Sequence, residues 1–422
     1  MLIKYMWVHQ QRALKTGSLS KKITIIGINY YPEDSAIGLY TTQKAEDFAS
    51  KGHQVTVITG FPYYPQWEIQ EKYKSKPYFL SETINGVNVL RCRQYVPTNP
   101  TFFKRIIHLI SFTLGSFINI FRVSKPDLVI SIVPFTSSIL LGWFLKLRYK
   151  SKLWVHVQDF EFDAALQTGV SNKGKGIYSF LFKLEKWLFS KADVSSTISD
   201  SMLSRLETKT NSERFFLPNW IDEKKINPET AIQHKYLISN KLKILYSGNI
   251  GDKQDWNVFV QFCNDLDDTK YEVIIVGDGA KKAWLIEQIK KLNVISYYPP
   301  VEYEELSSLL CSADLHILFQ KSDVIDTVMP SKILGMMASG KPSLVLGSEY
   351  SEVKTIFENS KAGLFYNNYS KSLINELDKL MNDPLECKKM GEDARNFVIS
   401  NFSKQYVLSR MIQKVDSLLQ TN

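Results

Sequence analysis

Short apolar runs alternate with helical patterns along most of this chain. The first run, at 23–28, lacks strict alternation of apolar and polar residues, as expected for a strand that a parallel sheet buries on both faces. A glycine-containing loop at 32–38 follows, then a helical pattern over 41–50 that ends at Gly52, and then a second strand at 55–59. This order of strand, loop, helix and strand is typical of the start of a doubly wound α/β domain.

The same alternation continues to about residue 198 and later starts again. Further strands are predicted at 87–91, 128–132, 152–157 and 193–198, and helices at 102–121, 137–147 and 177–190. A polar stretch at 218–240 is typical of a linker, and the strand pattern resumes at 242–247 and 271–276. Two α/β units in series are therefore predicted, and such units bind ligands at the carboxyl ends of their strands.

Length and composition favour two globular domains. The chain has 422 residues, of which 44% are hydrophobic and 23% charged, so it exceeds one ordinary core and is not a disordered or low-complexity protein. Its four cysteines form no C-x-x-C pair, which excludes a disulfide scaffold and a zinc module and favours a reducing cytoplasm. Residues 1–22 contain no apolar segment of the secretory-signal type, and we interpret them as an extension.

Positive charge is concentrated in the first half of the chain. Residues 1–220 hold 28 basic and 16 acidic side chains, whereas residues 221–422 hold 24 and 27. A basic first half points to an anionic partner, which could be nucleic acid, an anionic membrane surface or a phosphorylated substrate. The basic residues are scattered and form no arginine-rich tract, so we expect no nucleic acid partner.

The most apolar stretch lies at 106–121. Its length of about 16 residues is short of the roughly 20 that a membrane-spanning helix needs. Two interpretations stay open for the predicted helix 102–121: it packs inside its domain, or it lies on an anionic leaflet as an interfacial helix. Both hold if one face packs and the other touches lipid. Basic residues flank the stretch on both sides, namely Lys104, Arg105, Arg122 and Lys125.

Three glycine-containing loops follow predicted strands. The loops 35–38 and 248–253 can offer backbone N–H groups to an anion, and 277–279 is a tight turn. The loop 35–38 precedes a helix and is either an anion site or an ordinary turn, and it lacks the G-x-G-x-x-G dinucleotide pattern. The loop 248–253 has the same construction and adds the positive charge of a lysine. Together the loops favour a diphosphate ligand. The residues that they contribute are Ile37, Gly38, Gly248, Asn249, Gly251, Lys253 and Gly277.

A further cation lies at the start of a predicted helix. Ser331 is predicted to cap the helix that follows Pro330, which places Lys332 in the first turn. A cation there opposes the helix dipole and is unfavourable by a few tenths of a kcal/mol, unless an anion binds beside it. Lys332 therefore either contacts an anionic ligand or extends into solvent.

Polar side chains gather where the strand 152–157 ends. His156, Asp159 and Asp163 lie at this carboxyl end, which is the place expected for acceptor chemistry in such a fold. The carboxylates could accept a proton or hydrogen-bond a sugar hydroxyl. The alternative for His156 is a buried histidine bonded only to its own domain.

These stretches resemble the family 4 glycosyltransferases of the GT-B class. The chain is most similar to the colanic-acid and fucosamine-transferase type, which builds bacterial surface polysaccharides. The resemblance extends from about residue 23 to the end of the chain. The matching stretches are 30–38, 51–59, 61–65, 156–163, 217–220, 247–253, 330–332 and 338–342.

The resemblance implies an α/β fold of the GT-B type, with two Rossmann-like, doubly wound domains that face each other across a cleft. An acceptor-binding domain would span 1–218, a nucleotide-sugar-binding domain would span 219–404, and the helix within 405–422 would pack back on the first domain. No metal or other cofactor is implied, because cations and helix termini can stabilise a leaving diphosphate.

The resemblance also assigns roles to individual residues. Gly251, Lys253 and Lys332 would face the diphosphate, and Asp159 is the first choice for an acceptor-side role, ahead of His156 and Asp163. The remaining donor-binding residues would be Ile37, Gly38, Gly248, Asn249, Gly277, Pro300, Val301, Asp326, Pro330 and Ser331.

One departure from the family concerns its two glutamates, which are eight positions apart. They would fall at Thr327 and Gly335, and neither is acidic. Asp326 could replace the first glutamate near the sugar. The second glutamate normally holds the ribose, so this contact stays unassigned at Gly335.

The predicted function is that of a retaining glycosyltransferase. It would move a sugar from a nucleotide-diphospho-sugar to a lipid-linked or growing glycan acceptor in the biosynthesis of capsule, O-antigen or exopolysaccharide. We expect a cytoplasmic protein that is peripheral on the inner face of the cell membrane, held there by its basic N-terminal domain and residues 102–121. The alternatives are a sugar-nucleotide 2-epimerase of the same fold and a catalytically inactive homologue that binds glycan or lipid.

Overall fold

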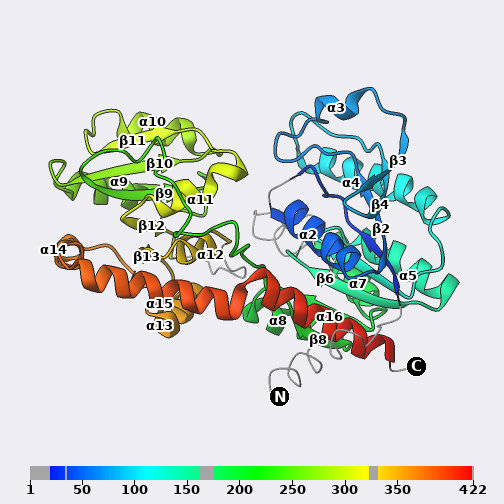
Figure 1. The fold of residues 1–422 in the computed structure, drawn as a ribbon. Helices are drawn as coiled ribbons and strands as arrows, with labels where there is room; N and C mark the ends of the chain where they lie inside the picture. Colours follow the sequence, from blue (N-terminus) through cyan, green and yellow to red (C-terminus); the bar gives the residue numbers. More distant parts are fainter. Residues whose placement is uncertain (1–19, 34–35, 161–174, 323–330, 421–422) are drawn as a thin grey trace, which may run out of the picture. The chain divides into compact units, whose positions relative to one another are not determined.

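The computed structural model describes residues 20–33, 36–160, 175–322 and 331–420, and Figure 1 shows their fold. Contacts within the chain divide it into two compact units, which are described separately here. The N-terminal unit comprises Met1–Ser196, Lys209–Arg214 and Val415–Asn422. The C-terminal unit comprises Thr197–Thr208 and Phe215–Lys414, so the last helix contributes residues to both units.

The N-terminal sheet has eight strands in the order β3-β4-β2-β1-β5-β6-β7-β8. β3 and β4 form an antiparallel pair, whereas β1 pairs in parallel with both β2 and β5. The inner strands are rich in valine and isoleucine and are buried along nearly their whole length, as parallel sheets require. The strands are β1 (Lys22–Ile26), β2 (Gln54–Gly60), β3 (Phe79–Ile84), β4 (Val87–Cys92), β5 (Leu128–Val133), β6 (Lys152–Val157), β7 (Val194–Thr197) and β8 (Glu213–Phe216).

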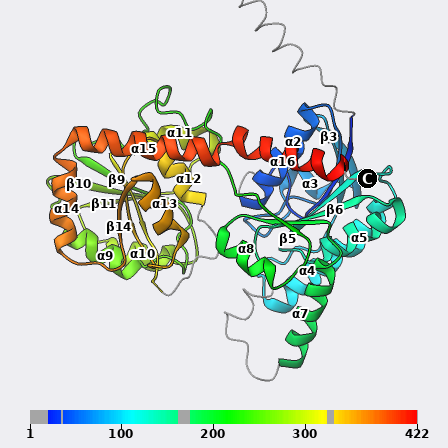
Figure 2. The same ribbon diagram turned by 90° about the horizontal axis from the view of Figure 1, so that it is seen from below.

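Helices cover both faces of this sheet. In Figure 2, α2 lies on one face, and α4, α5 and α7 lie on the other. α5 contacts both of its neighbours, α4 and α7. In the described parts of the chain, no helix combines the length and the apolarity that a bilayer crossing requires. The helices are α2 (Ala36–Ser50), α3 (Glu71–Lys74), α4 (Phe102–Ile120), α5 (Ser137–Tyr149) and α7 (Lys175–Phe189).

The C-terminal sheet has six strands in the order β11-β10-β9-β12-β13-β14, and every pair of neighbours is parallel. The largest hydrophobic core of this unit lies on both faces of the sheet. The strands are β9 (Leu242–Ser247), β10 (Tyr271–Val276), β11 (Ile295–Tyr298), β12 (Leu315–Phe319), β13 (Ser343–Leu346) and β14 (Gly363–Tyr366).

Short helices connect these parallel strands, and two long helices end the chain. They are α9 (Trp256–Asp265), α10 (Lys282–Ile289), η2 (Tyr303–Glu305), α11 (Leu306–Cys311), α12 (Ser331–Ala338), α13 (Glu352–Ser360), α14 (Ser372–Met381), α15 (Pro384–Phe402) and α16 (Lys404–Gln420). A further helix, α8 (Asp200–Glu207), connects β7 and β8 of the N-terminal sheet.

Each sheet has one point where the direction of strand addition reverses. In the C-terminal sheet this switch point lies between β9 and β12, and in the N-terminal sheet it lies between β1 and β5. Open α/β sheets bind ligands at the carboxyl ends of the strands beside the switch point. The topology therefore predicts that ligands bind at the loops that follow β1, β5, β9 and β12.

Candidate active site

The loops that follow β9 and β10 lie in contact because glycines line both of them. Gly248 has a φ of +134°, and its N–H donates to the carbonyl of Val276 at 2.9 Å. A Cβ at Gly277 would lie only 2.0 Å from the carbonyl oxygen of Gly248. No other residue type fits Gly277 without moving the two loops apart, so this predicted site residue is fixed by packing between the loops.

The next residues of the loop after β9 are held by side chains of α9 and the turn before it. The N–H of Gly251 donates to Gln254 Oε1 at 3.2 Å, and the carbonyl of Gly251 accepts a hydrogen bond from Trp256 Nε1 at 2.8 Å. Trp256 and Gln254 therefore use both backbone groups of Gly251. These two hydrogen bonds fix the conformation of the loop. The side chains of Asn249 and Lys253, in the same loop, are exposed to solvent.

Lys332, from α12, packs against this loop, although the loop ends 79 positions before it in the sequence. Its Nζ donates to the hydroxyl of Tyr246 at 2.6 Å and to the carbonyl of Asn249 at 3.1 Å. The side chain crosses Gly248 so closely that a Cβ there would lie 2.4 Å from Lys332 Cε. The missing side chain of Gly248 thus makes room for a lysine from α12.

The environment of Lys332 disfavours its positive charge. Burial lowers its pKa from 10.5 to about 7. Among the residues that the structure describes, none forms an ion pair with it, and its partners are a hydroxyl, a carbonyl and the ring of Tyr246 at 4.6 Å. An anion at this position would restore the charge, because an opposite charge within a few ångströms favours the ionised form.

Lys253 stands at the other end of the same loop. Its carbonyl accepts a hydrogen bond from the N–H of Lys321 at 3.1 Å, which holds the loop beside the carboxyl end of β12. The side chain is exposed. The structure therefore brings the two predicted lysines, Lys253 and Lys332, to one loop at the switch point of the sheet.

Other predicted donor residues lie at the same edge of the C-terminal sheet. Pro300 and Val301 follow β11, and the N–H of Gly277 donates to Tyr298 at the end of that strand at 3.2 Å. Asp326 and Pro330 lie outside the described residues. Ser331 is the first described residue of α12, and Lys332 follows it in the helix.

Gly335, where the family's second glutamate would fall, lies in α12. The residue is buried, and a Cβ at this position would lie 3.2 Å from Leu310 Cδ1. The glycine therefore packs against α11. It presents no side chain that could hold a ribose.

On the N-terminal unit, His156 is buried at the end of β6. Gln158 Nε2 donates to His156 Nε2 at 3.0 Å, which leaves Nδ1 to donate to Ser196 Oγ at 2.8 Å. Burial, with a smaller contribution from the charge of Lys44, holds the pKa of His156 well below its usual value. His156 is thus a neutral histidine in this structure. Asp159 is exposed nearby in the sequence, and Asp163 lies outside the described residues.

Lys44 is a residue that the sequence analysis missed. It lies on α2 with 1% of its surface exposed, and its Nζ has no hydrogen-bond partner among the described residues. Burial lowers its pKa to about 7. The sequence offers no signal for it, because lysine is ordinary on a helix whose outer face meets water.

The helix α2 begins at Ala36, five residues before the predicted start at 41. Ile37 and Gly38 therefore lie in its first turn, where backbone N–H groups are free of intrahelical partners. A Cβ at Gly38 would lie 2.7 Å from the carbonyl oxygen of Glu33, so this glycine lets the helix start approach the preceding loop. The Glu33 carboxylate accepts hydrogen bonds from the N–H groups of Tyr63 (2.7 Å) and Tyr64 (2.8 Å).

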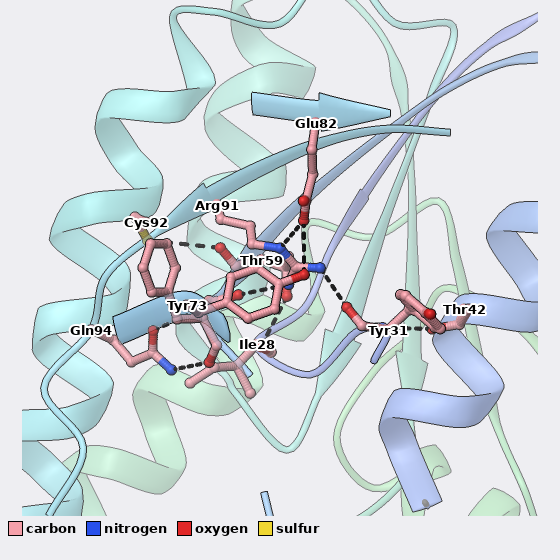
Figure 3. Close-up of polar contacts among 11 residues, drawn as sticks. Ile28, Tyr31, Thr42, Thr59, Tyr73, Glu82, Arg91, Cys92 and Gln94 are labelled. Carbon is pink, nitrogen blue, oxygen red and sulfur yellow. Dashed lines mark hydrogen bonds and ion pairs between the residues drawn. The ribbon is translucent and has the colours of Figure 1, made fainter. Parts of the chain in front are cut away.

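A buried arginine holds the loop after β1 in place, as Figure 3 shows. Arg91 Nε donates to Glu82 Oε1 at 2.5 Å, and Nη1 donates to the carbonyl of Gly60 at 3.0 Å. Nη2 donates to the carbonyl of Tyr31. One side chain thus connects β4, the end of β2 and the loop that precedes α2. Arg91 is fully buried, and the sequence analysis assigned it no role.

Comparisons with known proteins agree with this architecture. The family described as "Glycosyl transferase 4-like domain" matches residues 35–220, and "Glycosyl transferases group 1" matches residues 228–397. The chain is similar to the putative colanic acid biosynthesis glycosyl transferase WcaI of Escherichia coli K12. The two share 36% identity over 352 residues, which cover 80% of this chain and 86% of that protein.

Two solved structures share the fold. Sucrose-phosphate synthase from Thermosynechococcus elongatus superposes with a TM-score of 0.72 at 14% identity, over 95% of this chain and 100% of that chain. Anabaena Alr3699/HepE in complex with UDP-glucose superposes with a TM-score of 0.63 at 12% identity, over 94% of this chain and 100% of that chain. At these identities the likeness concerns the fold alone.

Proposed function

Because this chain belongs to the GT4-like, group 1 glycosyltransferases of the GT-B fold, we propose that it transfers a sugar from a nucleotide-diphospho-sugar to a lipid-linked or growing glycan. The resemblance and the fold class inferred from the sequence are both confirmed. The process is the biosynthesis of a bacterial surface polysaccharide, as the name of the E. coli relative suggests. We further propose that the anomeric configuration is retained, and that capsule, O-antigen or exopolysaccharide is the product.

The observation that supports this proposal most is the position of Lys332. The half-buried amine of Lys332 donates two hydrogen bonds to β9 and the loop after it, has a lowered pKa, and lacks a charged partner among the described residues. The diphosphate of a nucleotide sugar would supply that partner, and the complex of HepE with UDP-glucose has a ligand of this class. Lys253 would add a second, mobile cation from the end of the loop.

The reaction that we propose needs these cations at one step. The bond between the anomeric carbon and a diphosphate oxygen breaks, and negative charge develops on the departing diphosphate. The acceptor hydroxyl oxygen bonds to the same carbon on the same face, and its proton passes to the departing diphosphate oxygen. Lys332 and Lys253 stabilise the developing charge, so no metal is required in this scheme. Asp159, with Asp163 as the second candidate, is proposed to orient the acceptor. The buried His156 does not contact the acceptor in this scheme, because Ser196 and Gln158 already hydrogen-bond both of its ring nitrogens.

Alanine substitutions test the two lysines. We expect Lys253→Ala and Lys332→Ala each to lower turnover about 10–1000-fold, the range for losing one such stabilising group. Lys290→Ala is the matched control, because Lys290 is an exposed lysine of the same unit that pairs with Glu287 on α10. Turnover at the wild-type level in either active-site variant would refute the assignment.

Product analysis tests the reaction class, after a thermal-shift panel of nucleotide sugars has identified the donor. Transfer requires that free nucleotide diphosphate appears together with a glycosylated acceptor. An isomerised nucleotide sugar would instead indicate a 2-epimerase. Absence of donor binding in calorimetry would indicate a homologue that only binds glycan or lipid.

We also propose that the N-terminal unit docks on an anionic membrane surface, through the face formed by α4, α5 and α7. This face exposes large apolar side chains that a water-facing surface does not need. Leu114 is 65% exposed and Phe103 is 76% exposed. The exposed apolar residues are Phe103, Ile106, Ile107, Ile110, Leu114, Phe117, Ile118 and Phe121 from α4 and its C-cap, Leu140 and Leu147 from α5, and Leu184 and Trp187 from α7.

The charge of the same helices complements anionic lipid. Their sequences contain a single acidic residue, Glu185, which is buried and paired with Lys209 at 2.5 Å. Basic residues lie on all three helices, including Lys104, Arg105, Lys146, Arg148, Lys183 and Lys186. An apolar surface with basic residues and no exposed carboxylate is the pattern of an interfacial membrane contact.

Flotation with liposomes tests the membrane contact. We expect the protein to float with vesicles that contain phosphatidylglycerol and less so with pure phosphatidylcholine, and Leu114→Glu to weaken both. Leu385→Glu is the matched control, because Leu385 is 81% exposed but lies on α15 in the C-terminal unit. Failure of the wild type to bind either vesicle would remove the membrane proposal and leave the catalytic proposal intact.

A further inference from the structure

An aromatic cluster surrounds one histidine at the carboxyl edge of the N-terminal sheet. Tyr63 and Trp67 belong to the loop after β2, and Phe135 follows the end of β5. His108, from α4, has its ring centroid 4.7 Å from that of Tyr63, 5.5 Å from Trp67 and 6.2 Å from Phe135. This edge, next to the switch point between β1 and β5, is where α/β sheets bind ligands.

The hydrogen bond of His108 fixes its tautomer. Its Nδ1 lies in hydrogen-bond contact with the carbonyl oxygen of Tyr95, and a carbonyl can only accept. Nδ1 therefore carries the proton. Burial lowers the pKa of His108, which keeps the ring neutral. Nε2 is consequently an unprotonated nitrogen with a free lone pair.

This Nε2 has no hydrogen-bond partner in the part of the chain that the structure describes. It is buried, the whole residue is 1% exposed, and no hydrogen-bond donor contacts the atom among the described residues. A buried acceptor without a donor is unfavourable, and phenylalanine or leucine would fill the same space without this penalty. The chemistry of an unprotonated nitrogen also limits what can bind. It accepts a hydrogen bond from O–H or N–H, and it does not attract an anion.

The backbone of Trp67 supports a functional role for the cluster. Trp67 has a φ of 55°, a left-handed conformation that is unfavourable for a bulky residue and is enriched at active sites and ligand-binding sites. Its side chain is half-buried between His108 and the guanidinium of Arg105, which lies 5.4 Å from the ring centroid. Trp67 is thus the half-exposed member of the cluster, beside the buried Tyr63 and His108.

We propose that His108 Nε2 accepts a hydrogen bond from a hydroxyl of the acceptor saccharide, whose apolar ring face packs against Trp67 and Tyr63. A sugar offers both features, a hydroxyl donor and an apolar face of C–H groups. The sugar reaches Nε2 by displacing the Trp67 ring outward. This inference rests on the proposed glycosyltransferase function and adds to it a binding residue on the acceptor side.

Two substitutions of His108 separate binding from packing. In His108→Asn the amide nitrogen can take the place of Nδ1 and keep the bond to Tyr95, but no atom replaces Nε2. In His108→Gln the longer amide can supply an oxygen acceptor near the position of Nε2. His53→Asn is the control, because His53 precedes β2 at the opposite edge of the sheet, where its Nδ1 accepts from the N–H of Lys21 at 3.3 Å.

The assay measures transfer from a labelled nucleotide sugar to lipid-linked saccharides extracted from the producing cells, and in parallel the hydrolysis of the donor without acceptor. We expect His108→Asn to lower kcat/KM for the acceptor about 10–100-fold, which corresponds to an unpaired buried hydroxyl. His108→Gln should recover part of this loss. Donor hydrolysis and the His53→Asn variant should stay at the wild-type level.

Two results would overturn the inference. One is a wild-type acceptor dependence in His108→Asn, and the other is an equal fall of transfer and donor hydrolysis in both His108 variants. If the wild type itself transfers no sugar, the proposed function fails, and NMR of the ¹⁵N-histidine-labelled protein still tests His108. A shift of its Nε2 signal on addition of methyl glycosides of glucose, galactose or N-acetylglucosamine supports the sugar site, and an unchanged signal refutes it.

Discussion

Replacement of Lys332 by methionine gives the sharpest test of the proposed donor site. Methionine keeps most of the volume of the lysine stem that crosses Gly248 and removes only the titrating amine. In the unliganded protein, burial lowers the pKa of Lys332 from 10.5 to about 7, so near neutral pH the amine is about half protonated. A nucleotide sugar carries two negative charges at all pH values in this range. Its binding should therefore recharge the amine.

The size of this effect follows from proton linkage. If the bound diphosphate returns the pKa of Lys332 close to 10, donor binding takes up one proton above pH 7, and the dissociation constant rises nearly tenfold per pH unit. From pH 6.5 to pH 8.5 we expect the wild type to lose about 20-fold in donor affinity, given the unliganded pKa of about 7. Lys332→Met should bind more weakly and show a nearly flat pH profile.

The free energy of unfolding gives a second, independent signature. Unfolded Lys332 binds a proton up to pH 10.5, whereas the folded protein releases it near pH 7, so the unfolded state holds more protons between these values. The stability of the unliganded wild type should therefore rise with pH relative to Lys332→Met, by about 2 kcal/mol between pH 7 and pH 9.

Isothermal titration calorimetry in buffers of different ionisation enthalpy measures the proton uptake directly, and chemical denaturation at a series of pH values measures the stability difference. The reasoning is refuted if the donor affinity of the wild type does not change over this range. It is also refuted if Lys332→Met has the same pH profile as the wild type.

Two further predictions concern the packing of a glycine and a buried ion pair. Gly277→Ala would place a Cβ 2.0 Å from the carbonyl oxygen of Gly248, and should destabilise the protein by about 1–3 kcal/mol and weaken donor binding. Gly347→Ala is the control, because the nearest atom to its Cβ would lie at 3.4 Å, and it should change neither property. Thermal unfolding measures the stability of both variants, and donor titration measures their affinity. Lys209→Met would remove the ion pair between Lys209 and the buried carboxylate of Glu185, and should lower the free energy of unfolding by about 3–5 kcal/mol. In denaturant titrations, the added substitution Glu185→Gln should recover most of this loss. No recovery is expected if Lys209 only fills space.

Eight strands, β1, β2, β4 to β7, β9 and β10, were readable from the sequence because each is a short, almost continuous run of apolar residues, whereas β8 and β11 to β14 were not predicted. The predicted strands 152–157, 242–247 and 271–276 coincide with β6, β9 and β10. The first helix was placed five residues too late, because Ala36 to Tyr40 contains no charged residue and no apolar–polar alternation that would indicate a helix. The hairpin strand β3 was not identified; it alternates exposed and half-buried residues at the edge of the sheet.

Two of the three candidate loops, 248–253 and 277–279, directly follow β9 and β10 as predicted, whereas Ile37 and Gly38 of the first loop lie in α2. The sequence did not show which residues form hydrogen bonds with the backbone of these loops. Gly251 was expected to approach a phosphate, but Gln254 and Trp256 hydrogen-bond its N–H and carbonyl.

By itself, then, the sequence determined the two α/β units, the family and the segments that line the carboxyl edges of both sheets, because these depend on local periodicity and on glycine. Only the tertiary structure decided how side chains distant in sequence meet. Lys332 donates hydrogen bonds to Asn249 and Tyr246, and His108 packs against Tyr63 with an Nε2 that has no partner among the described residues. The charge of Lys332 depends on its burial, and the tautomer of His108 depends on its hydrogen bond to Tyr95. Both the burial and the hydrogen-bond partner are set by residues distant in the sequence.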